Sequence, residues 1–346
     1  MLIYLMVIIV LFVMHSNLQT ESNVTRRIKL EHSYVRSIYM LFIILAALRY
    51  VMPGTDIDGY MFYYNNMGSM DWSEIPKRWN GNYVMYFSMC KAFSYTHLSY
   101  QFWFGFLELL YITGFARLIN KLSIDKLLGV FLFFTIGLFS FSFNGLKQVA
   151  AMAFIWHAFA FFYDKKYVSA VMFSVIAFYC HKTSLFFVLS FALVILKNFR
   201  FIYVAIGFLA ITVIAAPGFI FSFLANSIED EQYLMYLGET SNATYTLLIL
   251  YVLLFSFAYT ENRKRKYLNS ADDKMIMVLA LISVVVQLFA QVSGTAFRLA
   301  LYYSPFLLIM LSNNVKNKNL RIGLMALMTV FMLYSGRQFP YKFFWQ

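Results

Sequence analysis

Apolar stretches alternate with polar loops along the whole chain, and this alternation restricts the possible folds more than any other feature of the sequence. Of the 346 residues, 61% are hydrophobic and only 13% are charged, which leaves too little polar surface for a water-soluble globule. A helix that crosses a bilayer needs about 20 apolar residues, and about 17 to 25 are tolerated. The longest stretches approach that length and lie at residues 37–52, 99–118, 127–143, 149–163, 201–223, 245–260, 275–293 and 297–312. We therefore expect an all-α polytopic membrane protein.

Shorter apolar stretches bring the expected number of transmembrane helices to about 12. They lie at residues 1–15, 167–180, 183–196 and 322–336. The first has no Lys or Arg before it and several after it, the reverse of a cleavable signal peptide, so we interpret it as a retained helix. No linker or internal repeat divides the sequence, which predicts one integral membrane domain over residues 1–346.

Basic residues are concentrated in every second loop. Most of the 28 Lys and Arg residues lie in this set, at positions 26, 27, 29 and 36, then 117, 121 and 126, then 165 and 166, then 197 and 200, then 263 to 266, and finally 316, 318 and 321. Lys and Arg favour cytoplasmic loops, so we expect this set in the cytoplasm and both chain termini outside. The net charge of +12 follows from this bias, so we expect the lipid bilayer, and no nucleic acid, as a partner.

The unusual polar motifs all fall on the loops of the opposite set, which predicts an outer-face active site. The longest of these loops are expected at residues 53–98 and 224–244, and the second carries the acidic run SIEDE. Within the first loop, residues 83–98 are moderately apolar. A transmembrane helix there would invert every later loop and place the basic loops outside the cytoplasm, against the charge bias. We therefore predict an interfacial or re-entrant segment. The motifs are GTDIDGY (54–60), NGLKQ (144–148), HKTS (181–184), the segment around residue 298 and FPY (339–341).

Four cationic residues are expected at the outer ends of apolar stretches: Arg49, Lys147, Lys182 and Arg298. A charge within a bilayer is costly and needs a reason. Arg and Lys are suited to phosphate oxygens, so the four side chains together would fit one anionic group. The alternative for each of them is that a long side chain reaches the headgroups from a buried stem.

His181 opens the HKTS turn and is a candidate general base, because a histidine accepts a proton near neutral pH. A hydrogen-bonded structural histidine is the alternative. Asp56 and Asp58 lie two residues apart and are suited to sugar hydroxyls, to proton transfer or to capping a turn. Two carboxylates alone are weak evidence for a metal, and the two cysteines form no zinc pattern. Nucleotide-binding motifs are also missing, so we expect no cofactor and no metal.

Several segments resemble the EpsG family of Wzy-type polysaccharide polymerases. The most specific is residues 144–187, which begin with NGLKQ, continue through a Lys-Lys turn and end with HKTSLFF. The segments LRYVMPGTDIDGYMFYY (48–64), FRLALYYSPF (297–306) and FPYKFF (339–344) are also similar to the family. Two positions depart from its pattern: Lys147 stands where the family has Arg, and Thr183 replaces a common Ser. Lys keeps the charge but loses the bidentate geometry of Arg.

The resemblance implies an enzyme that joins oligosaccharide repeat units carried on undecaprenyl pyrophosphate, at the outer face of the bacterial cytoplasmic membrane. A chain-length regulator protein is a further implied partner. In this hypothesis Arg49, Lys147 and Arg298 hold the pyrophosphate, with Arg298 and the base His181 as the catalytic pair. Asp56 and Asp58 then orient sugar, and Gln148 and Lys182 complete the binding site. A flippase for the same lipid-linked unit, a glycan ligase and a membrane acyltransferase remain as alternatives.

Overall fold

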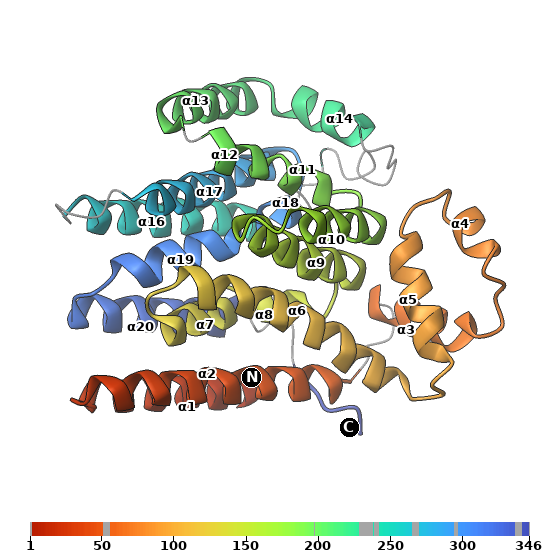
Figure 1. The fold of residues 1–346 in the computed structure, drawn as a ribbon, viewed down its shortest axis with the longest axis horizontal. Helices are drawn as coiled ribbons and strands as arrows, with labels where there is room; N and C mark the ends of the chain where they lie inside the picture. The colour runs from red at the N-terminus through yellow and green to blue at the C-terminus, as the bar shows by residue number, and fades with distance from the viewer. Residues whose placement is uncertain are drawn as a thin grey trace. The chain divides into compact units, whose positions relative to one another are not determined.

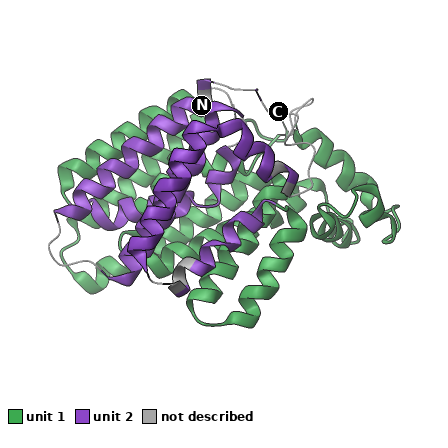
Figure 2. Cartoon of the chain, turned by 90° about the horizontal axis from the view of Figure 1, so that it is seen from above, with its two compact units in different colours: residues 1–182, 317–346 green, residues 183–316 purple. Residues whose placement is uncertain are grey.

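The computed structural model describes residues 2–50, 56–196, 198–227, 238, 242–264, 270–293, 297–335 and 341–345. Within these ranges the regular structure is helical apart from one isolated β-bridge, which confirms the all-α prediction (Figure 1). The chain forms two compact units (Figure 2). Unit 1 comprises residues 1–182 and 317–346, and unit 2 comprises residues 183–316.

The helices of unit 1 are α1 (Leu2–Thr20), α2 (Val24–Ala47), α3 (Asp56–Met67), α4 (Glu74–Arg78), α5 (Val84–Ser94), α6 (Tyr100–Leu122), α7 (Lys126–Thr135), α8 (Leu138–Phe141), α9 (Leu146–Tyr163), α10 (Tyr167–Cys180) and α20 (Lys318–Ser335). Those of unit 2 are α11 (Ser184–Val188), α12 (Ser190–Leu196), α13 (Phe199–Ala215), α14 (Pro217–Ser227), α16 (Asn242–Arg263), α17 (Ala271–Gln287), the 3₁₀ helix η1 (Leu288–Gln291), α18 (Phe297–Leu301) and α19 (Ser304–Asn314).

Among the described residues, six helices are long and apolar enough to cross a membrane: α1, α2, α6, α9, α16 and α17 with its η1 extension. The bent pair of α13 and α14 would make a seventh span if it counts as one. This supports a membrane protein, whereas the number of about 12 transmembrane helices stays a prediction. α5, in the segment expected to be interfacial, has 11 residues and is shorter than a span.

Three of the predicted spans are broken helices. The stretch 127–143 forms α7 and α8, which are separated at Gly137, whose φ of +97° favours glycine. The stretch 201–223 bends by 108° between α13 and α14, and Pro217 begins the second helix. The stretch 297–312 forms α18 and α19, and α19 has a proline in its first turn. Apolar composition predicted these segments as helical, but not where each helix ends.

The core of unit 1 is aromatic and lies between α6, α7 and α9. The ring centroids of Phe115 and Phe133 are 4.2 Å apart, and those of Tyr111 and Trp156 are 5.1 Å apart. The backbones of α6 and α9 approach closely at Gly114, where an added Cβ would lie 2.7 Å from the backbone oxygen of Ala153. α6 can therefore pack this closely against α9 only with glycine at that position.

We expect Gly114→Ala to destabilise the protein by about 1 to 3 kcal/mol, since the methyl group would force the two helix backbones apart. The measurement is the melting temperature of the purified protein in detergent. Gly207→Ala in α13 is the matched control, because an added Cβ there meets no atom within 4 Å. Equal melting temperatures for both variants would contradict the close contact of α6 with α9.

A small charged cluster links the end of α6 to the turn between α9 and α10. The Asp164 carboxylate accepts a hydrogen bond from the Lys121 ammonium and lies 3.8 Å from Arg117 Nη2. The hydrogen bond from Lys121 is the main reason why the pKa of Asp164 lies below its usual value of 3.8. This cluster helps to fix the α9–α10 turn, although partly exposed pairs contribute little.

Because the pKa of Asp164 is lowered in the folded state, its stabilisation is present above the unfolded pKa and is lost as the pH falls through the folded pKa. We expect Asp164→Asn to reduce stability by up to about 1 kcal/mol at neutral pH. The deficit should disappear in acid, measured as the difference in melting temperature from the wild type. Asp71→Asn, at an exposed position, is the control. A deficit that persists at every pH would exclude the ionic explanation.

Candidate functional site

Two of the predicted site residues, Lys147 and His181, lie at the same end of a helical hairpin. Lys147 is the second residue of α9, and His181 is the C-terminal cap of α10. The two helices pack along their length and run in opposite directions, so the start of α9 and the end of α10 are brought together (Figure 1). The NGLKQ and HKTS motifs, about two helix lengths apart in the sequence, therefore meet in the fold.

Tyr83 connects these two residues. The Lys147 ammonium lies 3.6 Å from the centroid of the Tyr83 ring, a close cation–π contact. The ring centroids of Tyr83 and His181 are 5.5 Å apart. Tyr83 itself is 7% exposed, and it precedes α5, which packs against α10. One aromatic side chain thus contacts both a cation and an imidazole.

The backbone of Tyr83 is in the left-handed region, with φ 57° and ψ 18°. An aromatic residue rarely adopts this conformation, which costs about 1 kcal/mol or more. Asn80 and Gly81 also have positive φ, so a tight turn delivers the Tyr83 ring to the hairpin end. Tyr83 is not among the site residues predicted from the sequence. The signal that was available is the Asn-Gly-Asn run before it, a turn composition.

α3 contributes a second aromatic ring and the two predicted carboxylates. The Lys147 ammonium lies 5.9 Å from the centroid of the Tyr60 ring. Asp56 and Asp58 occupy the first turn of the same helix, where the helix dipole favours negative charge. Asp56 is exposed and Asp58 is partly exposed. Both interpretations of the pair, capping of the helix and sugar binding, are compatible with this position. Residues 54 and 55 of the GTDIDGY motif lie outside the described residues.

Arg49 is buried inside unit 1, with 5% of its surface exposed. Its guanidinium lies between two rings, 4.6 Å from the Phe104 centroid and 4.1 Å from the Phe143 centroid. Its Nη2 donates a hydrogen bond of 2.9 Å to the backbone oxygen of Phe143, while Nη1 is buried without a hydrogen-bond partner. Glu108, buried in α6, interacts electrostatically with Arg49. Since Phe143 directly precedes NGLKQ, Arg49 holds the segment that leads to Lys147.

The C-terminal segment pairs with the chain around Arg49. The Tyr50 amide donates to the Lys342 oxygen at 2.8 Å, and the Phe344 amide donates to the Leu48 oxygen at 2.9 Å. The Tyr341 hydroxyl donates to the Leu45 oxygen at 2.6 Å. The LRY and FPYKFF motifs, far apart in the sequence, are therefore neighbours in unit 1. Residues 339 and 340 of FPY lie outside the described residues.

The other predicted site residues are placed as follows. Gln148 is buried in the first turn of α9, next to Lys147 in sequence, and Lys182 is partly buried after His181. Arg298 lies in α18 and belongs to unit 2. Within unit 2, the Thr183 hydroxyl is 3.0 Å from the Tyr302 hydroxyl, which joins the HKTS and FRLALYYSPF motifs. Within unit 1, the structure thus brings Lys147 and His181 to Tyr83, with the Tyr60 ring of α3 near the Lys147 ammonium.

Metal ligation has no support in the described part of the chain, which contains no group of three or more His, Cys, Asp or Glu side chains suited to a metal. Cys90 and Cys180 are buried free thiols. Burial raises the pKa of Cys90 to about 12, so its thiol stays protonated at neutral pH.

The EpsG family model matches residues 32–345, nearly the whole chain. This chain belongs to the EpsG family. The match confirms the resemblance that was carried by the LRY, NGLKQ, HKTS and FPYKFF segments. No curated protein and no solved structure matches the chain. The EpsG family assignment makes the protein a membrane protein of the glycan polymerase type, consistent with its apolar helices.

Proposed function

We propose that this EpsG protein is a polysaccharide polymerase that joins oligosaccharide repeat units carried on undecaprenyl pyrophosphate. The reaction takes place at the outer face of the bacterial cytoplasmic membrane, which the protein spans several times. The observation that carries the proposal is the contact of Tyr83 with both Lys147 and His181, within a chain that the family model matches almost completely.

The proposed reaction is a glycosyl transfer. A sugar hydroxyl of one lipid-linked unit attacks the anomeric carbon of the growing chain, a new C–O bond forms, and the bond from that carbon to the pyrophosphate oxygen breaks. The products are a chain longer by one repeat unit and undecaprenyl pyrophosphate. His181 accepts the hydroxyl proton as general base, since a positioned histidine is suited to this transfer near neutral pH.

Lys147 stabilises the negative charge that develops on the departing pyrophosphate. A fixed cation aimed at developing charge stabilises the transition state more than the ground state. Lys acts as a point charge with mobile donors, so it needs a partner that holds it in place. The face of the Tyr83 ring does this by the cation–π contact at 3.6 Å.

The remaining predicted residues have supporting roles in this proposal. Asp56 and Asp58, in the first turn of α3, orient sugar hydroxyls, and Gln148 and Lys182 contact the substrate. Arg49 is a positioning residue, because its guanidinium holds the backbone before NGLKQ from inside the protein. For Arg298, the contact with pyrophosphate stays a prediction from the resemblance. A chain-length regulator protein stays a predicted partner.

The length distribution of surface polysaccharide tests this function. We expect cells that lack this gene to show single capped repeat units in place of the ladder of long chains, because export and attachment still work. Complementation with the wild-type gene should restore the ladder. Total loss of surface glycan would indicate a flippase or a ligase, and an unchanged ladder would reject the role in polysaccharide synthesis.

Tyr83 variants test the proposed site within the same assay. We expect Tyr83→Ala to lower long-chain polymer by about tenfold or more, since a desolvated cation–π contact contributes about 2 kcal/mol. Tyr83→Phe should retain most of the polymer, because it keeps the ring below Lys147. Equal polymer from Tyr83→Ala and wild type, at equal protein levels, would remove Tyr83 from the site.

A further inference from the structure

A basic groove runs along one face of α2, away from the residues discussed above. It is lined by Lys29, His32, Ser33, Arg36 and Ser37. These positions are spaced by three, four, seven and eight residues, which places them on one side of the helix over about two turns. Lys29, Ser33, Arg36 and Ser37 are exposed, and His32 is partly exposed. The groove lining thus combines cations and hydroxyl groups without a carboxylate.

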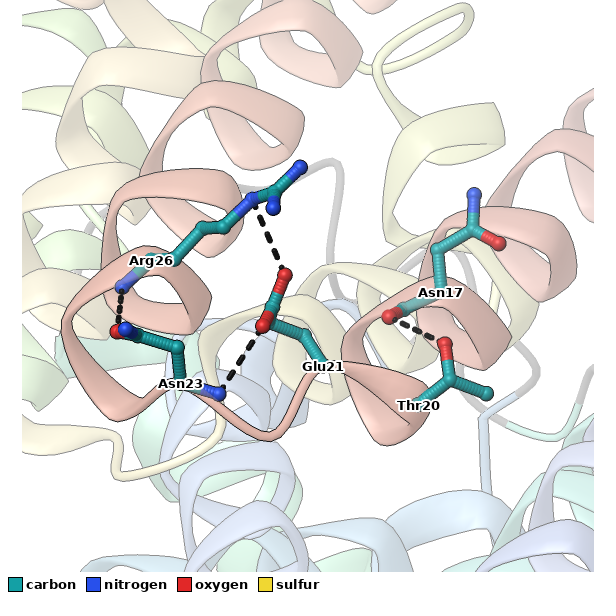
Figure 3. Close-up of polar contacts among 5 residues, drawn as sticks. All are labelled: Asn17, Thr20, Glu21, Asn23 and Arg26. Atoms are coloured by element: carbon teal, nitrogen blue, oxygen red, sulfur yellow. Dashed lines mark hydrogen bonds and ion pairs between the residues drawn. The ribbon is translucent and has the colours of Figure 1, made fainter.

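The carboxylates nearest in sequence are already engaged. Glu21 pairs with Arg26 at 3.1 Å and accepts a hydrogen bond of 3.0 Å from the Asn23 amide, in the turn between α1 and α2 (Figure 3). Glu31 accepts from the Lys126 amide at 2.8 Å. Asp125 pairs with Arg321 at 3.0 Å. Among the described residues, Lys29 and Arg36 therefore have no acidic partner.

A further cation borders the groove. The Lys126 ammonium lies 3.4 Å from His32 Nε2, so the groove gathers three Lys or Arg charges within about two helical turns. Like charges held this close repel each other in the absence of a counter-ion. An anionic group bound between Lys29 and Arg36 would relieve that repulsion, and the Ser33 hydroxyl is a hydrogen-bond donor suited to a phosphate oxygen. The Ser37 hydroxyl donates to the Ser33 backbone oxygen at 3.1 Å.

The same face of α2 continues as an apolar surface. Met40 and Ile44 follow Arg36 at spacings of four and eight residues and are 60% and 49% exposed. Both lie within a helix that is long and apolar enough to cross a membrane. A basic groove followed by an exposed apolar stripe has the chemistry of a phospholipid, with a headgroup phosphate at one end and acyl chains beside the other. A soluble anion would need only the basic groove and not the apolar stripe.

We propose that this face of α2 binds an anionic phospholipid of the surrounding bilayer. The headgroup phosphate lies between Lys29 and Arg36, and an acyl chain packs along Met40 and Ile44. Basic loops favour the cytoplasmic side, so the lipid belongs to the cytoplasmic leaflet, where anionic headgroups attract Lys and Arg. This binding does not depend on the proposed polymerase activity, and its test involves no glycan.

The test measures the binding of phosphatidylglycerol and phosphatidylcholine to the purified full-length protein by native mass spectrometry. We expect the wild type to prefer phosphatidylglycerol. The double variant Lys29→Gln/Arg36→Gln should bind phosphatidylglycerol about thirtyfold more weakly. This is the loss expected when two cations are removed from a site at an anionic membrane surface. Lys165→Gln/Lys166→Gln is the matched control, because it removes two exposed charges from another turn of unit 1 and should keep the preference.

Three outcomes would overturn the proposal. These are equal affinity of the wild type for the two lipids, equal weakening in the two double variants, and displacement of phosphatidylglycerol by millimolar inorganic phosphate, which would indicate a site for a soluble anion. If the Lys29 and Arg36 variant does not fold, Ser33→Asp places a negative charge at an exposed position of the groove and leaves both cations in place. We expect the same loss of preference from this variant, and an unchanged preference would also overturn the proposal.

Discussion

Replacing Lys147 with glutamine is expected to lower the rate of polymer formation by about 10²- to 10³-fold, the effect of removing one group that stabilises developing charge in an active site. The amide keeps much of the side-chain length and polarity but cannot carry the charge that faces the leaving pyrophosphate. The helix should remain intact, because Lys147 is only partly buried and glutamine is a good helix former. The measurement is the initial rate of chain elongation by protein of confirmed expression.

Two further variants separate the charge of Lys147 from its geometry. Lys147→Arg should retain much of the activity, since it keeps the charge above the Tyr83 ring and adds bidentate donors. Lys165→Gln, which removes a charge from the exposed α9–α10 turn, should elongate at the wild-type rate. If Lys147→Gln also elongates at that rate, the cation does not act on the pyrophosphate.

The second large effect is expected at His181. His181→Asn should lower the elongation rate by about 10²- to 10⁴-fold, because a positioned general base contributes that much. The remaining activity should also lose the acid limb of its pH profile, a change that a purely structural histidine would not produce. His97→Asn is the matched control, since His97 is exposed and asparagine tolerates its left-handed backbone, with φ 54°. A His181→Asn enzyme with the wild-type rate and pH profile would end the base assignment.

The sequence predicted the helical class for a definite physical reason. Apolar composition requires helices in a membrane, because every backbone polar group must be satisfied within the segment. The NGLKQ and HKTS motifs were expected on the same side of the membrane, and the hairpin of α9 and α10 places them at one of its ends. The position of the helix breaks was not predictable in the same way. Gly137 and Pro217 lie at helix breaks here, whereas Gly105 and Gly114 lie inside α6.

The site residues that the sequence analysis missed or interpreted differently depend on long-range contacts. Tyr83 is one of many tyrosines in its loop, and only its backbone conformation and its two partners distinguish it. Arg49 was expected at the outer end of a helix beside phosphate. The structure places its guanidinium between the Phe104 and Phe143 rings. The backbone of Arg49 forms a β-bridge with Phe343 of the C-terminal segment. No local pattern reports a contact between residues 94 positions apart.

Elongation by the purified protein in liposomes that contain lipid-linked repeat units tests the proposed polymerase activity directly. The products are separated by length, and the released undecaprenyl pyrophosphate is quantified. We expect chains of several repeat units with one undecaprenyl pyrophosphate released for each new linkage, and Lys147→Gln should form both products about 10²- to 10³-fold more slowly. Movement of intact lipid-linked units across the bilayer, without elongation or release, would contradict this expectation and identify a transporter.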